Sequence, residues 1–437
     1  MTQSPASPVS EQATDRRPHL LLISTGARLF REYLLASIAE QYRIHLFLAA
    51  EPQWETRYLD AVTVLADTLD ADLMIAAARE LDARDRIDGV LCWDEARIHA
   101  AAFVAQALGL RNGDPAVVGR LRDKGQTRIA LDAAGVRQPR SVPVKDLPQA
   151  LAAAAQVGYP AILKPRALGA SLGVVRVENA EELRRMFAFT HGTRGPEPVE
   201  LPEQPVLVEE CVIGEEISID SVVTGGRVTP LFIGRKVLGY PPYAEEVGHY
   251  VSAGDPLLTD PVLLAAVQDT HTALGFSDGW THSEFMLTAS GPQVIEVNGR
   301  LGGDLIPYLG LLATGVDPGL AAARAACGLP PDLTAVHDRT AAIRFFYVAE
   351  ENTEISSVRF ETGGLPEEIH QVLTIAKPGA VVSPPPKGTA FGRIALAIAV
   401  GDSVAGCAGA LDGAEAALVV SGVVQPSTIA DPSLEEV

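Results

Sequence analysis

Two acids, an amide and an arginine come close together in the segment from Glu284 to Gly303, which reads EFMLTASGPQVIEVNGRLGG. Two apolar-rich runs flank a Thr-Ala-Ser-Gly turn there, a pattern that predicts a β-hairpin whose first strand starts at Glu284. Glu296 and Asn298 lie on one face of the second strand, with Arg300 just beyond its end. Two carboxylates and an amide oxygen suit Mg²⁺ that also binds phosphate oxygens. The alternative is a surface hairpin with solvated acids.

A glycine-rich loop earlier in the chain could hold phosphates. The run PAILKP at 160–165 predicts a strand with Lys164 near its end, followed by a loop containing Gly169, Ser171 and Gly173. Such a loop can fold over phosphates and offer backbone N–H groups without side-chain obstruction. It is not a Walker A loop, because GxxxxGK[ST] is missing and no helix follows directly. A simple Gly-Ser hairpin turn is the alternative.

Alternating strand and helix patterns before residue 110 predict a parallel α/β sheet. Asp70 suits the N-cap of a helix at 71–81. Gly26 follows the first strand, but no GxGxxG accompanies it, so a dinucleotide site is not favoured. The predicted strands are 19–25, 43–49, 62–65 and 88–93.

Residues 115–134 form one helical pattern, in which Arg120 and Arg122 are interpreted as a solvated basic face. Further on, two successive β-hairpins predict an antiparallel sheet distinct from the N-terminal layer. Residues 235–255 lack clear periodicity and are a candidate binding loop. The strands of the hairpins are 205–210, 215–223 and 228–233, and later elements are helices at 261–274, 304–312, 318–327 and 404–417 and strands at 340–349 and 392–400.

Length and composition restrict the class of protein. The chain has 437 residues, 47% of them hydrophobic, which is enough for several domains. Its net charge of −20 argues against nucleic acid as the main partner. The four cysteines show no metal-binding spacing, so reduced thiols are expected. No apolar run has membrane-spanning length and the polar start lacks a signal peptide's hydrophobic core, so a cytoplasmic protein without a membrane partner is expected.

Taken in order, these features resemble the ATP-grasp ligases. The resemblance covers about 110 to 330 and rests on Lys124, PAILKP with the glycine-rich loop, VEECVIGEEISID, and EFML followed by VIEVNGRLGG. It implies an α/β protein of the ATP-grasp fold, with central α+β nucleotide-binding domains. The expected parts are a disordered lead-in at 1–18, an N-terminal parallel α/β domain at 19–112, an ATP-grasp domain at 113–335 with a lid subdomain at about 140–212, a small C-terminal α+β domain at 336–425, and a tail at 426–437.

The same resemblance implies a nucleotide site for ATP and Mg²⁺, or Mn²⁺ in its place. Lys124 and Lys164 look like the lysines that contact the phosphates, under a lid at Gly169, Ser171 and Gly173. Arg300 is similar to the arginine that stabilises charge at the reacting centre. Glu209, Glu210 and Val212 look like the hinge that reads adenine, Glu216 like the ribose ligand, and Glu284, Glu296 and Asn298 like the metal ligands.

Within the superfamily, the chain most resembles L-amino-acid ligases, which join two amino acids. Glu246 and His249 have the ExxH spacing seen there, which implies that Glu246 pairs with the ammonium of the N-terminal amino acid and that His249 lines the substrate pocket. Gly302, Gly303 and Asp304 would belong to the same pocket. A plain surface loop is the alternative for Glu246 and His249.

Other ATP-grasp enzymes share the nucleotide site and remain alternative hypotheses. They include D-alanine-type ligases, purine-pathway enzymes and biotin-carboxylase-like proteins, although no biotinyl Met-Lys motif is present. A non-catalytic ATP-binding protein is a further alternative. The expected partners are small amino-acid substrates, and the resemblance suggests a homodimer.

Overall fold

A parallel four-stranded sheet begins the described part of the chain. The computed structural model describes residues 17–426 except 170, 196–201, 242 and 244, so nearly all of the predicted lead-in and tail lie outside the described residues. The Asp70 carboxylate accepts a hydrogen bond from the Leu73 N–H, which confirms the predicted N-cap. Strand order is β3-β2-β1-β4, all parallel, as predicted. The elements are β1 (His19–Ile23), α1 (Arg28–Gln41), β2 (Arg43–Leu48), β3 (Ala61–Val64), α2 (Ala71–Arg84), β4 (Gly89–Leu91) and α3 (Ile98–Ala107).

Two helices replace the single one predicted at 115–134: α4 (Pro115–Arg122) and α5 (Lys124–Ala133). Asp123 separates them, because its backbone is extended and its carboxylate accepts from the first N–H groups of α5. The interpretation of Arg120 and Arg122 as a solvated face is wrong. Both are half-buried, since Arg120 donates to the Leu274 carbonyl at 2.9 Å and Arg122 approaches an acid on the loop after β4.

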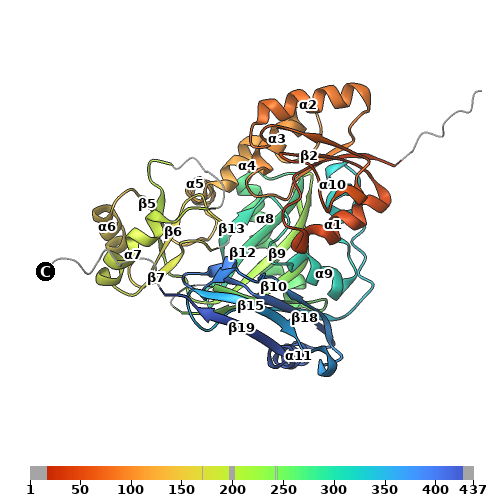
Figure 1. The fold of residues 1–437 in the computed structure, drawn as a ribbon. Coiled ribbons are helices and arrows are strands. Elements are labelled where there is room, and N and C mark those ends of the chain that lie inside the picture. The colour runs from red at the N-terminus through yellow and green to blue at the C-terminus, as the bar shows by residue number, and fades with distance from the viewer. Residues whose placement is uncertain (1–16, 170, 196–201, 242, 244, 427–437) are drawn as a thin grey trace, which may run out of the picture.

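A small antiparallel sheet with its own apolar core follows, in the order β5-β8-β6-β7. Figure 1 shows it with α6 and α7 at one side of the molecule. The prediction that 205–210 and 215–223 form a hairpin is wrong, because β8 pairs with β5 and β6 while β9 belongs to the next sheet. The elements are β5 (Ser141–Val144), α6 (Leu147–Val157), β6 (Ala161–Pro165), β7 (Val175–Val177), α7 (Ala180–Gly192) and β8 (Val206–Glu210).

An eight-stranded antiparallel sheet forms the centre of the molecule (Figure 1), in the order β13-β12-β9-β10-β11-β14-β18-β16. The predicted β12–β13 hairpin is confirmed, but Glu284 lies inside β12 and does not start it. The candidate loop at 235–255 is largely strand, shared by β10 and β11. The elements up to residue 326 are β9 (Glu215–Thr224), β10 (Arg227–Gly239), β11 (Glu245–Ser252), α8 (Pro261–Leu274), β12 (Gly279–Thr288), β13 (Gly291–Asn298), α9 (Ile306–Thr314) and α10 (Pro318–Ala326).

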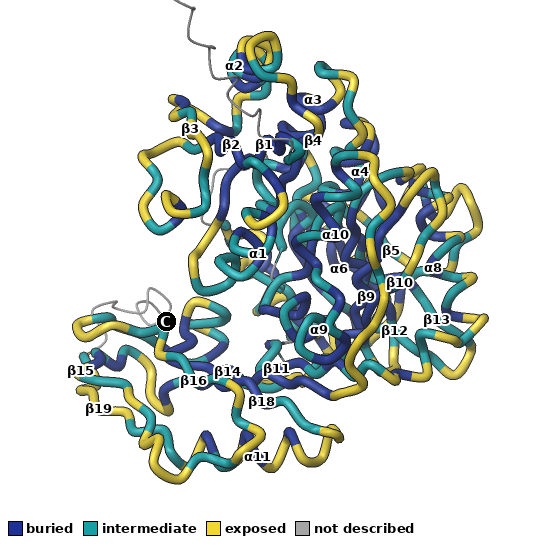
Figure 2. Tube along the Cα trace, turned by 90° about the vertical axis from the view of Figure 1, so that its right-hand side faces the viewer, coloured by how far each residue is buried: buried dark blue, intermediate teal, exposed yellow. Residues whose placement is uncertain are grey.

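The C-terminal part of the chain extends this central sheet and adds a three-stranded one, β17-β15-β19. Because strands from both sides of residue 335 join one sheet, the boundary proposed there separates segments that share backbone hydrogen bonds. Figure 2 shows buried residues at the centres of the sheets and mostly exposed residues along β19. The elements are β14 (Thr340–Phe346), β15 (Thr353–Phe360), β16 (Ile369–Thr374), β17 (Val381–Val382), β18 (Ala395–Gly401), α11 (Val404–Ala416) and β19 (Leu418–Val424).

Helices connect the sheets into one framework. Helix α10 packs against α1 and β4 on one side and against β9 and β12 on the other, which joins the N-terminal sheet to the central one. All four cysteines are unpaired, as predicted. Among the described residues, no helix combines the length and apolar character needed to cross a bilayer.

Candidate active site

A cavity of about 830 Å³ is lined by residues of both the small sheet and the central sheet. Gly173, His249 and Gly302 are the predicted site residues that do not line it. Residues far apart in the sequence therefore meet at one place. Those lining the cavity are Lys124, Lys164, Gly169, Ser171, Glu209, Glu210, Val212, Glu216, Glu246, Glu284, Glu296, Asn298, Arg300, Gly303 and Asp304.

The two hairpin acids lie directly opposite each other, because Glu284 pairs with Glu296 across β12 and β13. Like charges in such a cross-strand pair destabilise a sheet unless a cation offsets them. Lysine ammonium groups supply that offset: Lys124 Nζ lies 3.1 Å from Glu296, and Lys236 Nζ lies 3.1 Å from Glu284. Asn298 follows on the same strand, so the oxygens present suit a hard divalent cation such as Mg²⁺.

Lys236 is the centre of a group of carboxylates that the sequence did not reveal. Its Nζ lies 2.7 Å from Glu216, 3.0 Å from Glu246 and 3.1 Å from Glu284, and its side chain is 3% exposed. Burial alone lowers the pKa of Lys236, but the three carboxylates outweigh burial and hold the pKa well above its usual value. Burial conversely raises the pKa of Glu216 despite the lysine. One buried cation thus joins three predicted subsites.

A second buried group lies where β6, β8 and α5 meet. The Glu209 carboxylate is 2.6 Å from Lys164 Nζ and accepts from Arg128 Nε at 2.8 Å. Burial raises the pKa of Glu209, but Arg128 and Lys164 outweigh it and lower the pKa to about 2. Burial lowers the pKa of Lys164, with Glu209 opposing that shift. The side chain of Glu209 is therefore paired with two buried cations.

The glycine-rich loop closes over Lys124, whose Nζ donates to the Leu168 carbonyl at 2.5 Å. Gly169 and Ser171 line the cavity, whereas Gly173 packs against α7. A Cβ on Gly173 would lie 2.8 Å from Thr193 Oγ1, and the backbone there has a φ of +73°, so close packing and a left-handed turn require glycine. Its place in the fold is structural rather than at the cavity wall.

Arg300 meets the N-terminal sheet at the cavity. Its Nε donates to Glu95, on the loop after β4, at 2.5 Å, and its Nη1 donates to the Leu301 carbonyl at 2.7 Å. Burial lowers the pKa of Arg300, but Glu95 outweighs burial and raises it. Glu95 orients the guanidinium, and sequence reasoning had no signal that linked these two residues.

A buried His–Asp pair supports the wall next to Glu284. His282 Nδ1 lies 2.9 Å from Asp220, and the other Asp220 oxygen accepts from the Trp280 indole at 2.8 Å and the Gly302 N–H at 3.0 Å. Burial alone lowers the pKa of His282, but Asp220 and Glu284 outweigh it and raise the pKa to about 9. A Cβ on Gly302 would lie 2.7 Å from His282 Nδ1, so only glycine fits against this pair.

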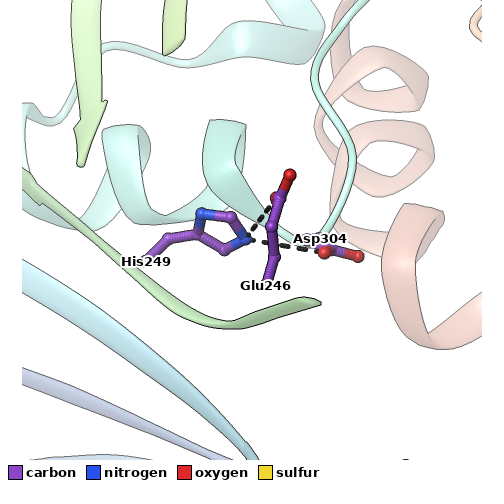
Figure 3. Close-up of side chains that lie close together, drawn as sticks. All are labelled: Glu246, His249 and Asp304. Carbon is purple, nitrogen blue, oxygen red and sulfur yellow. Dashed lines mark ion pairs between the residues drawn. The ribbon is translucent and has the colours of Figure 1, made fainter. Parts of the chain in front are cut away.

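Glu246, His249 and Asp304 lie close together (Figure 3), and Glu246 and Asp304 line the cavity. His249 Nε2 lies 3.3 Å from Glu246 and 3.5 Å from Asp304, and candidate ligand atoms of the three residues lie within 4.8 Å of one another. Glu246 is already paired with Lys236, and Asp304 with Arg393 at 2.7 Å. A divalent ion there would face both of these cations, which repel it.

Comparison with known proteins agrees with this geometry. The ATP-grasp domain model matches residues 157–307. Alanine–anticapsin ligase of Bacillus subtilis is 27% identical over 242 residues, covering 51% of this chain and 50% of the relative. Carnosine synthase 1 of Homo sapiens is 27% identical over 267 residues, covering 57% and 32%. The chain thus spans half or less of the length of these two named relatives.

The fold also matches that of a solved ligase structure. The crystal structure of an L-amino acid ligase from Bacillus licheniformis superposes with a TM-score of 0.74 and 20% identity, covering 94% of this chain and 100% of that one. The match includes both the segment before and the segment after residues 157–307, so the architecture as a whole is that of an ATP-grasp protein. Residues 157–307 form an ATP-grasp domain within a chain of that fold, and the chain resembles the carboxylate–amine ligases of the superfamily, a family whose members are enzymes that form C–N bonds.

Proposed function

We propose that this protein activates an amino-acid carboxylate with ATP and joins it to the amine of a second amino acid, releasing ADP and phosphate. The observation that carries the proposal is the cavity itself. It combines two lysines, an opposed pair of acids and an arginine with two further carboxylates, Glu246 and Asp304, which we call the amine-binding end. A site that must bring a carboxylate to a polyanion and hold an amine nearby needs both kinds of surface.

In the first step, the substrate carboxylate attacks the γ-phosphorus of ATP and ADP leaves, which forms an acyl phosphate. Lys124 and Lys164 would bind the phosphates and offset repulsion between the two anions. A magnesium ion held by Glu284, Glu296 and Asn298 would supply further charge neutralisation at the phosphates. Main-chain groups from Glu209 to Val212 would contact the adenine, and Glu216 the ribose.

In the second step, the amine attacks the acyl carbon, phosphate leaves, and the amine loses a proton. Arg300 would stabilise the tetrahedral oxyanion through the guanidinium N–H groups that Glu95 leaves free. Glu246 would bind a substrate ammonium, and the loop at Gly169 and Ser171 would exclude water, since acyl phosphates hydrolyse readily.

The amine-binding end distinguishes this proposal from other ATP-grasp chemistry. A protein that carboxylates with bicarbonate has no ammonium to bind at that position, whereas two carboxylates with free acceptor capacity line this cavity. The resemblance to dipeptide-forming ligases also suggests a homodimer, which light scattering after size-exclusion chromatography measures.

The direct experiment follows nucleotide products with the full chain, ATP and MgCl₂. Pairs of L-amino acids, D-alanine alone and bicarbonate are separate arms, and mass spectrometry identifies the products. We expect ADP and phosphate with L-amino-acid pairs and none after chelation by EDTA. Release of AMP and pyrophosphate would exclude the acyl phosphate. Turnover with D-alanine alone or with bicarbonate alone would show that L-amino acids are not the substrates.

Substitution of Arg300 tests the second step. Removing one stabiliser of an oxyanion costs about 10²–10³ in turnover, so Arg300→Ala should lower kcat by about that factor and change ATP affinity less than about threefold. Arg111→Ala is the matched control, because Arg111 is an exposed arginine near Asp278. An unchanged rate in Arg300→Ala would remove the assigned role.

A further inference from the structure

The turn that carries Asp304 has a strained backbone. Asp304 and Leu305 have φ angles of +50° and +63°, a left-handed conformation that non-glycine residues rarely adopt, and they do so in succession. Residues persist in such conformations where their surroundings hold them, and they concentrate at ligand sites. Leu305 is buried, which fixes one side of the turn. The Asp304 carboxylate lines the cavity, so some other contact must fix the polar side.

That contact comes from Arg393, which lies just before β18 in the C-terminal part of the chain. Its Nη1 and Nη2 donate to the two Asp304 oxygens at 2.7 and 2.9 Å, a paired geometry in which each carboxylate oxygen has its own donor. Nη2 also donates to the Glu246 carbonyl at 3.0 Å. One guanidinium therefore ties the strained turn before α9 to the start of β11.

The guanidinium of Arg393 is itself held in place. It lies over the Phe345 ring at 3.7 Å, and its Nε donates to the Tyr347 hydroxyl at 3.2 Å. Tyr347 in turn donates to the buried Glu245 at 2.8 Å. Arg393 is 5% exposed and does not line the cavity, so it acts on the cavity through the residues that it holds.

We propose that Arg393 is the positioning residue of the amine-binding end. It fixes the Asp304 carboxylate and the backbone of Glu246, so that both acids face a substrate carrying a protonated amine. The C-terminal part of the chain thereby completes the site. The identity of the substrate rests on the proposed function, whereas the coupling of Arg393 to the turn does not.

The coupling is tested without substrate, by hydrogen exchange of peptides that cover residues 300–307. Arg393→Met should accelerate exchange in this segment at least tenfold relative to the native chain. Arg344→Met is the matched control, because Arg344 lies on β14 and pairs with the more exposed Asp412 and Glu415, and it should leave the segment unchanged. Equal exchange in the Arg393 variant and the native chain would overturn the proposal. Asp304→Asn, which keeps the shape and removes the charge, gives the same test if Arg393→Met does not fold.

Kinetics then separate positioning from general loss of structure. Arg393→Met should raise the KM for the amino acid whose amine binds there at least tenfold and leave the KM for ATP within about threefold. Arg393→Lys should recover part of the effect, since it keeps the charge without the paired geometry. Equal increases in both KM values, or no difference between the Met and Lys variants, would overturn it. A native chain with no turnover on any amine would refute the proposed function and leave the exchange result to decide the coupling.

Discussion

Removing the charge of Lys236 tests the network of ion pairs along the cavity wall. In Lys236→Met, the carboxylates of Glu216, Glu246 and Glu284 lose the cation that lies within 2.7–3.1 Å of each of them. Leaving buried charge without its partner costs about 3–5 kcal/mol. Unfolding entropy is about 2.1 cal/mol/K per residue, which for 437 residues unfolding together makes about 1 °C per kcal/mol. The expected loss is therefore about 3–5 °C in Tm at pH 8.

The same variant should show a new dependence on pH. The pKa of Lys236 is raised well above 10.5, so in the native chain its stabilising effect is constant from pH 5 to pH 8. Without the lysine, burial raises the pKa values of the three carboxyl groups. A carboxyl group whose pKa is raised by folding favours the folded state at low pH, and this stabilising effect is lost as pH rises. The Tm deficit should thus be smallest at pH 5 and largest at pH 8.

Differential scanning calorimetry of the nucleotide-free chain at several pH values measures the deficit. Lys387→Met is the matched control, since Lys387 is 43% exposed beside Glu351, and it should shift Tm by less than about 0.5 °C at any pH. A deficit below 1 °C at pH 8, or one that grows toward pH 5, would refute the assignment of Lys236 as the essential counter-charge.

Two further predictions concern the buried pairs beside the cavity. His282 has a pKa of about 9 against an ordinary 6.5, so its stabilising effect is complete below pH 6.5 and is lost as pH rises through about 9, on the order of 3 kcal/mol in all. The Tm difference between the native chain and His282→Gln should shrink over that interval, and exposed His191→Gln should show no such trend. Glu209→Gln should cost about 3–5 kcal/mol at pH 7, where the native carboxylate with its pKa of about 2 is fully charged, and should weaken ATP binding in calorimetry. Glu210→Gln, at a half-exposed pair, should cost less than about 0.5 kcal/mol, and equal effects of the two would contradict the reasoning.

Strand pairing over a short turn made the β12–β13 hairpin predictable, since local alternation and turn residues fix which side chains share a face. The start of β12 was missed for a physical reason. His282 and Ser283 are polar, yet both are buried, and His282 is paired with Asp220 on β9. A polar residue can occupy a buried strand position when its partner is on a neighbouring strand, and the partner is not visible in a local pattern.

The prediction of a loop at 235–255 was wrong for a similar reason. The charged residues of β10 and β11 made the two strands look like a loop in the sequence. These charges are tolerated in the sheet because Lys236 and Glu246 neutralise each other across it. Local sequence patterns often disagree with the observed fold at functional sites. Glu95 and Arg393 lay beyond sequence reasoning altogether, since each contacts a residue far away in the chain that only the packing of separate sheets brings near.

The ion pairs also explain how a metal ion and phosphates could enter while each lysine keeps another hydrogen-bond acceptor. Lys236 can release Glu284 and keep Glu216 and Glu246, and Lys124 can release Glu296 and keep the Leu168 carbonyl. Each lysine therefore has a second partner within the cavity wall. Since breaking a buried pair is costly mainly when one charge is left alone, this arrangement lowers the cost of exchanging lysine for metal at the hairpin. Phosphate oxygens that arrive with the metal would then give both ammonium groups a new partner, which favours entry of the two together over entry of the metal alone.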